Sequence, residues 1–318
     1  MQEKLADSGG PTAAAARPPV RKTGFGRRIG RLLGGFTSSL ATIASYPTGA
    51  AGLAIIAFFV VLALSAPWVA PHAPFDVLTG ESKQLLRLKP PSAAAPFGTT
   101  NQSMDVFSQV IWGSRIALLV GLTAAVGSAV LGTLIGLFSG YFGGRTDDIL
   151  MRITDVAFGI PFLPFALVIL SITGPSLAII ITLIVCFLWR TTARVVRSQV
   201  LTLRQRPFIW AARAAGTSEI KILFVHIAPN VLPLMFLYMA IGVQAGVMLE
   251  AALAFLGFGD PNLISWGRML NLAFKAGAVR TAWWWVLPPG LSLSLFVIAI
   301  FMVTRAYEEA LNPRLRQM

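Results

Sequence analysis

Few residues in this chain have a type and spacing that suit catalysis. The two histidines, His72 and His226, lie far apart in the sequence, and neither has a nucleophile or a set of metal ligands at a useful local spacing. The single cysteine, Cys186, lies in an apolar run and has no second cysteine with which to form a disulfide. ATP binding through a phosphate loop requires a Gly-Lys pair, which the sequence lacks. We therefore predict no catalytic residue, no metal site and no cofactor bound by the chain itself.

Three charged residues in or beside apolar runs suit other kinds of chemistry. Glu250 is the one carboxylate deep within such a run, and an isolated charge in hydrocarbon is costly. It is therefore a candidate for a translocation path or a gate, with hydrogen bonding to a neighbouring helix as the alternative. Arg152 and Asp155 are three residues apart, so they can pair on one helical face. We predict a structural ion pair there, with a transport role as the alternative.

Long apolar runs indicate a membrane protein. Hydrophobic residues make up 55% of the chain and charged residues 12%. A helix needs about 20 apolar residues to cross a bilayer, and the runs are continuous rather than alternating, which argues against barrel strands. The sequence therefore predicts an all-α integral membrane protein with six spans. These are residues 48–70, 112–138, 150–172, 176–195, 231–257 and 284–306.

The basic residues indicate how these spans are oriented. The net charge is +13, and with the N-terminus in the cytoplasm 19 of the 26 Lys and Arg residues lie on the cytoplasmic side. The positive-inside rule explains this excess without nucleic-acid binding. We expect a cytoplasmic basic arm over residues 1–47, an external loop over 71–110, a core domain over 111–306 and a cytoplasmic tail over 307–318. The Pro-rich loop is either part of a docking face for an external partner or a solvated linker.

Residues 207–230 form a polar, basic stretch between two apolar runs. A protein that only had to cross the bilayer would not need such a stretch. Pro207 can begin a helix there, and Pro229 marks its predicted end. Gly216 is unfavourable within a helix, so it predicts a bend or a close approach of another backbone. Small and apolar residues recur at helical spacing and form a thin face suited to a groove on another protein. This face consists of Ala212, Gly216, Ile220 and Leu223.

The same stretch resembles the EAA loop of ABC importer permeases. The resemblance rests on Ala211-Ala212, then Gly216 after three residues, then residues 226–230 (His-Ile-Ala-Pro-Asn) after nine more. In that family the loop is a coupling helix that inserts into a cleft on the cytoplasmic ATPase subunit, so we name residues 205–230 the coupling segment. Trp210 stands where the family usually has Glu. The resemblance implies that the ATPase-coupling residues are Trp210, Ala211, Ala212, Arg213, Gly216, Ile220, His226, Pro229 and Asn230.

Other motifs resemble the permeases of dipeptide, oligopeptide and nickel importers. They include Phe97-Gly98-Thr99-Thr100, Gly140-Tyr141-Phe142-Gly143-Gly144, Phe255-Leu256-Gly257-Phe258-Gly259 and Asn312-Pro313-Arg314. Thr100, Ser103 and Met104 depart from the usual pattern. The resemblance covers residues 96–316 and implies a type I ABC importer transmembrane domain. By the same resemblance the chain is a second, C-type permease subunit without an ATPase motif of its own.

The resemblance also implies a location and a set of partners. The chain would lie in the plasma (inner) membrane of a bacterium or archaeon with both termini cytoplasmic. It would pair with a homologous permease in the lipid bilayer, rest on two ATPase subunits that bind ATP and Mg, and receive substrate from an external binding protein. Peptides, glutathione-like compounds, nickel complexes and oligosaccharides are all open as substrates.

Two other classes of protein are alternatives. A secondary transporter or channel would work without ATPases, and such proteins commonly contain two repeats, whereas this sequence shows no internal repeat. A membrane enzyme would need a convergent polar site, which the sequence does not show.

Overall fold

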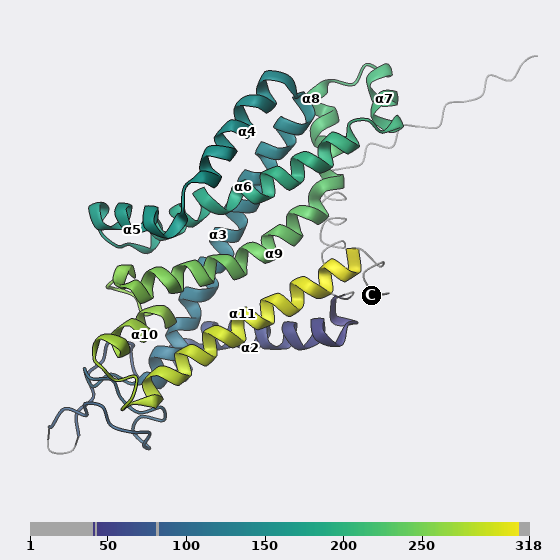
Figure 1. Ribbon diagram of the computed structural model, residues 1–318. Helices are drawn as coiled ribbons and strands as arrows, with labels where there is room; N and C mark the ends of the chain where they lie inside the picture. The colour runs from purple at the N-terminus through teal and green to yellow at the C-terminus, as the bar shows by residue number, and fades with distance from the viewer. Residues whose placement is uncertain (1–40, 42, 81–82, 312–318) are drawn as a thin grey trace, which may run out of the picture. The chain divides into compact units, whose positions relative to one another are not determined.

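The computed structural model describes residues 41, 43–80 and 83–311. Most of the predicted basic arm, and Asn312-Pro313-Arg314 of the predicted tail, lie outside the described residues. The chain divides into two units, residues 1–41 and 42–318, and the helices below belong to the second. They are α2 (Pro47–Val69), α3 (Val106–Phe142), α4 (Gly144–Gly159), α5 (Phe162–Thr173), α6 (Leu177–Leu203), α7 (Pro207–Ala214), α8 (Glu219–Lys221), α9 (Ala228–Leu253), α10 (Trp266–Lys275) and α11 (Trp283–Leu311), with π-helical turns at Ile222–Ile227 and Ala254–Phe258 (Figure 1).

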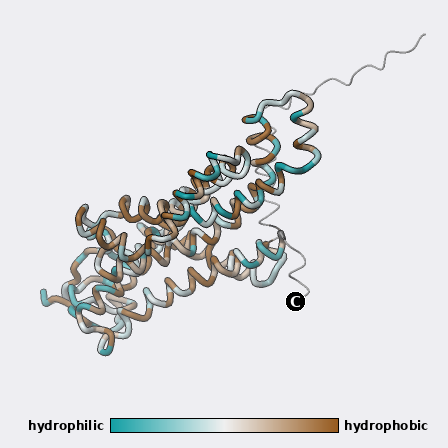
Figure 2. Tube along the Cα trace, turned by 45° about the horizontal axis from the view of Figure 1, so that its top comes forward, coloured by the Kyte–Doolittle hydropathy of each residue, from teal (hydrophilic) through white to brown (hydrophobic). Residues whose placement is uncertain are grey.

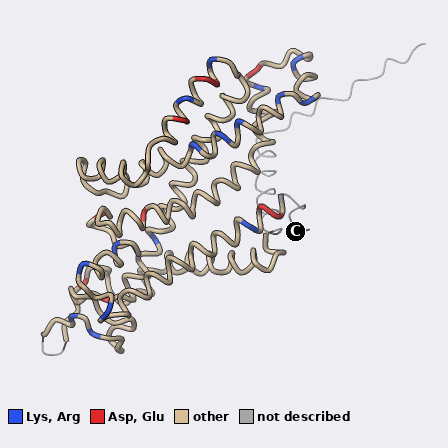
Figure 3. The backbone as a smooth tube through the Cα atoms, viewed as in Figure 1, with Lys and Arg blue, Asp and Glu red and all other residues tan. Residues whose placement is uncertain are grey.

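Five helical stretches in the described part of the chain are long and apolar enough to cross a membrane. They are α2, α3, α6, the stretch Glu219–Phe258 that contains α9, and α11. The residues along these stretches are mostly hydrophobic, and hydrophilic residues lie near the ends (Figure 2). Charged residues are concentrated on α4, α6 and α7 at one end and on the loops around α10 at the other (Figure 3). These stretches confirm five of the six predicted spans.

The predicted span over residues 150–172 is wrong as a continuous helix. It contains most of α4 and all of α5 except Thr173, and the two helices are bent by 84° relative to each other. Pro161 causes the break, because a residue before proline is pushed out of the helical conformation. Ile160 accordingly has extended dihedral angles, with φ −90° and ψ 121°. A sixth span exists only if the bent pair is counted as one.

The longest helix, α3, packs most extensively against α6. Three glycines of α3, Gly132, Gly136 and Gly140, face the α6 backbone. A Cβ atom on Gly132 would lie 2.4 Å from the carbonyl oxygen of Trp189, and one on Gly136 would lie 2.6 Å from that of Ala193. Such distances leave no room for a side chain, so the two backbones are in contact over more than two helical turns. Small residues that permit this close approach are a common basis of helix association in membranes.

The predicted external loop is folded against the helices that follow it. The Trp284 indole Nε1 donates a hydrogen bond to the carbonyl oxygen of Thr99 at 3.3 Å. Gln109 Nε2 of α3 donates to the carbonyl oxygen of Pro74 at 2.9 Å. The carboxylate of Asp105 caps the first turn of α3, which fixes the end of the loop. These contacts hold the described part of the loop against α3 and α11.

The contact between α3 and α6 leads to a first prediction. We expect Gly136→Ala to destabilise the protein by about 1–3 kcal/mol, the range seen when atoms are added to a well-packed interior. Gly159→Ala is the matched control, because a Cβ atom on Gly159 would meet nothing within 4 Å. Thermal unfolding of both variants in detergent measures the difference. Equal midpoints for the two variants would contradict the proposed packing.

Candidate functional site

The coupling segment is two short helices joined by a turn rather than one helix. The first, α7, ends in a Schellman motif, in which the Thr217 N–H donates to the Ala212 carbonyl oxygen at 3.1 Å and the Gly216 N–H donates to the Arg213 carbonyl oxygen at 2.9 Å. Gly216 has a φ of +72°, a left-handed conformation that favours glycine. The predicted bend is therefore confirmed. A close approach is not, because a Cβ atom on Gly216 would meet nothing within 4 Å.

The predicted end of the helix at Pro229 is wrong. After the turn, α8 leads into the π-helical turn Ile222–Ile227, and Pro229 lies in the first turn of α9. Proline is tolerated there because the first helical turn does not need its missing N–H. The side chain of Asn230 donates to the His226 carbonyl oxygen at 2.6 Å, within this junction. His226, Pro229 and Asn230 thus belong to the start of the α9 span and are separated from α7.

A buried apolar group, which we name the anchoring cluster, holds the coupling segment to the spans. Ile209 of α7 and Ile222, Leu223 and Ile227 of the π-helical turn have no solvent-exposed surface. They pack against buried residues of α3, α6 and α9. The full cluster is Leu137, Tyr141, Val196, Val200, Ile209, Ile222, Leu223, Ile227 and Val231. Because the segment is packed against three spans, it cannot move far without them.

The residues of the predicted thin face do not lie on one side of the coupling segment. Leu223 lies in the anchoring cluster and Ala212 packs partly against it, whereas Ile220 is exposed. The break at Gly216 explains the difference, since residues on either side of it no longer share one helical face. Phe208, Trp210 and Ile220 are instead individually exposed, and Trp210 has 60% of its surface exposed. Ala211 is exposed as well.

A polar contact joins the two halves of the segment to the end of α3. The Tyr141 hydroxyl donates a hydrogen bond to the carboxylate of Glu219 and accepts one from Arg213 Nη2 at 3.4 Å. Arg213 Nη2 also lies 3.6 Å from the Glu219 carboxylate. The hydrogen bond to Tyr141 is the main cause that raises the pKa of Arg213 above its usual value. Sequence reasoning assigned no role to Glu219, although it is the one acidic residue of the segment.

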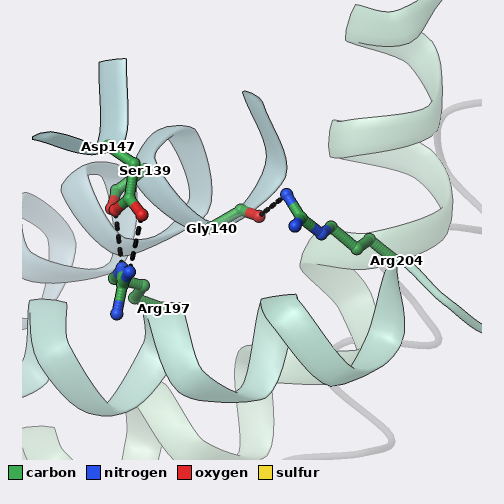
Figure 4. A network of polar contacts seen from close by, with 5 residues as sticks. All are labelled: Ser139, Gly140, Asp147, Arg197 and Arg204. Atoms are coloured by element: carbon green, nitrogen blue, oxygen red, sulfur yellow. Dashed lines mark hydrogen bonds and ion pairs between the residues drawn. The ribbon is translucent and has the colours of Figure 1, made fainter. Parts of the chain in front are cut away.

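A second network fixes α4 and α6 to the same end of α3 (Figure 4). The Arg197 guanidinium donates two hydrogen bonds to the Asp147 carboxylate, at 2.6 and 2.5 Å, and the Ser139 hydroxyl donates to the same carboxylate. Arg204 Nη1 donates to the Gly140 carbonyl oxygen at 3.2 Å. The two residues that precede Tyr141 are thereby held by side chains from two other helices.

The predicted ion pair between Arg152 and Asp155 is wrong. Asp155 pairs instead with Arg194 of α6, at 2.7 Å between Nη2 and Oδ1. The reason is that α4 packs beside α6, which places a guanidinium across from Asp155. Arg152 has no ion pair among the described residues. The Arg194 and Asp155 side chains are 51% and 66% exposed, so their pair contributes at most about 1 kcal/mol.

Glu250 is buried between α9 and α10, with 4% of its surface exposed. The side chain of Ser265, which caps α10, hydrogen-bonds with its carboxyl group. The two helices are in close contact here, because a Cβ atom on Gly267 would lie 2.4 Å from the Ala251 carbonyl oxygen. This position supports the helix-packing alternative for Glu250.

Comparison with known proteins gives the family. The model of binding-protein-dependent transport system inner membrane components matches residues 132–317. The model of the N-terminal transmembrane domain of oligopeptide transport permease C matches residues 47–91. The chain belongs to the family of binding-protein-dependent transport permeases. The predicted family and the all-α membrane fold class are therefore confirmed.

Similar individual proteins cover most of the chain. The dipeptide transport system permease protein DppC of Bacillus subtilis is 34% identical over 268 residues, which are 84% of this chain and 82% of that protein. The di/tripeptide transport system permease protein DppC of Pseudomonas aeruginosa is 33% identical over 272 residues, 83% of this chain and 88% of that protein. A solved structure of the MetNI methionine ABC transporter is similar with a TM-score of 0.49 and 20% identity, covering 64% of this chain and 95% of that chain.

Substitution of Glu250 separates packing from a role in the transport path. We expect Glu250→Gln to reduce substrate uptake by less than about threefold, because the amide can still hydrogen-bond with Ser265 and the lost interaction is small. Uptake by reconstituted transporter is measured beside a thermal-stability assay, with Glu309→Gln on α11 as the matched control. Loss of uptake at normal stability would place Glu250 in the path instead.

Proposed function

We propose that this chain is one of the two permease subunits of an ABC importer for peptides, equivalent to the second, C-type subunit. ATP binding and hydrolysis with Mg on partner subunits would drive the transport. The observation that carries the proposal is that α7 exposes the large apolar side chain of Trp210 while its neighbour Ile209 is buried in the anchoring cluster, which holds α7 on the spans. A large apolar side chain exposed in this way is typical of a protein-binding site. Peptides are favoured as the substrate because the similar permeases named above are dipeptide and di/tripeptide permeases.

In the proposed assembly, each end of the spans contacts a different partner. The coupling segment would dock into a groove of an ATPase subunit on the cytoplasmic side, and a homologous permease would complete the pathway in the lipid bilayer. The ordered loop before α3 would contribute to docking an external binding protein. The excess of basic residues on the coupling-segment side supports a plasma (inner) membrane location with both termini cytoplasmic.

The anchoring cluster supports a mechanism for coupling. Because residues of α7 and of the π-helical turn are buried against α3, α6 and α9, a displacement of the docked segment would displace these spans with it. Closure of the ATPases would in this way change the access of the substrate pathway from one side of the membrane to the other. A channel or secondary transporter has no ATPase to bind, so it would not need exposed apolar side chains held firmly on its spans.

Replacement of Trp210 tests the proposed docking. We expect Trp210→Ala to weaken association with the ATPase subunits by about tenfold or more, because exposed tryptophans in interfaces often contribute 2 kcal/mol or more to binding. Trp283→Ala is the matched control, since Trp283 is also 60% exposed but begins α11, away from the coupling segment. Co-purification of the ATPase subunits with each variant gives the result. Unchanged association for Trp210→Ala would contradict the docking proposal.

A further inference from the structure

We propose that Tyr141 is a positioning residue that holds α7 and α8 in one fixed orientation, so that motion of the ATPases reaches α3. The inference rests on the proposed function of the coupling segment and extends it to a residue outside that segment. Tyr141 does not contact the proposed partner. It acts through Arg213 on one side of the Gly216 turn and through Glu219 on the other.

The turn at Gly216 is closed by the two backbone hydrogen bonds of the Schellman motif. Gly216 is exposed, and a Cβ atom on it would meet nothing within 4 Å, so no other described part of the chain packs against the turn itself. The relative orientation of the two helices therefore depends on these bonds, on the anchoring cluster and on side-chain contacts made by the residues around the turn. Arg213 and Glu219 make such contacts, and both converge on the Tyr141 hydroxyl.

Tyr141 is itself held firmly. It is 4% exposed, its ring lies in the anchoring cluster, and the ring packs edge-on against Phe142 with centroids 5.3 Å apart. The preceding residues are fixed as well, because Arg204 binds the Gly140 carbonyl oxygen and the Ser139 hydroxyl belongs to the Asp147–Arg197 network (Figure 4). The Tyr141 hydroxyl thus extends from an end of α3 that is held in place through the two preceding residues.

The tyrosine hydroxyl contributes more to this contact than the ion pair does. Arg213 and Glu219 are both partly exposed, and their charged groups are 3.6 Å apart, so solvent screens the pair. A hydrogen bond from a hydroxyl to a charged carboxylate is stronger than one between neutral groups. The Tyr141 bond to Glu219 is therefore the side-chain contact that fixes the start of α8 to α3, in addition to the anchoring cluster behind it.

Loss of this hydroxyl should affect coupling more than docking. The exposed apolar side chains that would bind the ATPase do not include Tyr141, and the phenyl ring of Tyr141→Phe can still fill the anchoring cluster. The ATPases would therefore remain bound and would still hydrolyse ATP. With the start of α8 held by the anchoring cluster alone, however, part of their motion would be absorbed in the segment instead of being passed to α3.

The experiment compares Tyr141→Phe with Tyr307→Phe. Tyr307 donates a hydrogen bond to the Pro233 carbonyl oxygen at 3.2 Å, so its substitution removes a tyrosine hydrogen bond, in this case to a neutral acceptor, away from the Gly216 turn. Substrate taken up per ATP hydrolysed is measured in vesicles that contain the complete transporter and its binding protein. We expect the ratio to fall about fivefold in Tyr141→Phe, as loss of one hydrogen bond to a charged group would cause, and to stay unchanged in Tyr307→Phe.

Two readouts separate this role from a merely structural one. The amount of ATPase that co-purifies should stay at the wild-type level in Tyr141→Phe, and the thermal midpoint should fall only slightly, as the loss of one hydrogen bond requires. An unchanged uptake ratio, or a loss of bound ATPase without a change in that ratio, would overturn the inference. If Tyr141→Phe does not assemble, Glu219→Ala provides the same test, because it removes the acceptor of the same bond. A wild-type chain that binds no ATPase would instead overturn the proposed function.

Discussion

The close contact between the backbones of α3 and α6 determines the geometry of the rest of the molecule. Gly132, Gly136 and Gly140 permit this contact, and it extends to the end of α3. In a bilayer, helix association depends largely on such packing, since lipid is as apolar as the side chains. Once α3 and α6 are aligned, Arg197 of α6 reaches Asp147, and Arg204, which directly follows α6, reaches the Gly140 carbonyl oxygen. The same alignment brings together the α3 and α6 residues of the anchoring cluster.

The coupling segment is stable because it packs against the anchoring cluster and not because of its own helix propensity. Its helices have eight and three residues, which is too short for stability in isolation. Ile209, Ile222 and Leu223 are each fully buried, and burying an aliphatic side chain of this size contributes about 1.5–3 kcal/mol. Burial on one side leaves Trp210 and Ile220 exposed on the other. The burial of Ile209, Ile222 and Leu223 thus holds the segment in place and leaves other apolar side chains of the segment exposed.

The sequence predicted features that depend on composition and local chemistry. Hydropathy located five spans, and glycine chemistry located the bend at Gly216. Hydropathy did not reveal the break at Pro161, because the runs on both sides of it were read as a single apolar stretch. Local spacing paired Arg152 with Asp155, whereas the fold gives Asp155 a partner 39 residues away. The contact between Tyr141 and Glu219, which are 78 residues apart, likewise depends on tertiary packing that no local pattern contains.

The central claim is that the coupling segment contacts the ATPase subunits, and site-directed cross-linking tests it most directly. A single cysteine is placed at Ala211, an exposed position of α7, in a Cys186→Ser background, and a second variant carries its cysteine at Arg280, an exposed position between α10 and α11. The account predicts that a short thiol cross-linker joins position 211, but not position 280, to an ATPase subunit in the assembled transporter. Assembly with bound ATPases but without an adduct at position 211 would contradict it.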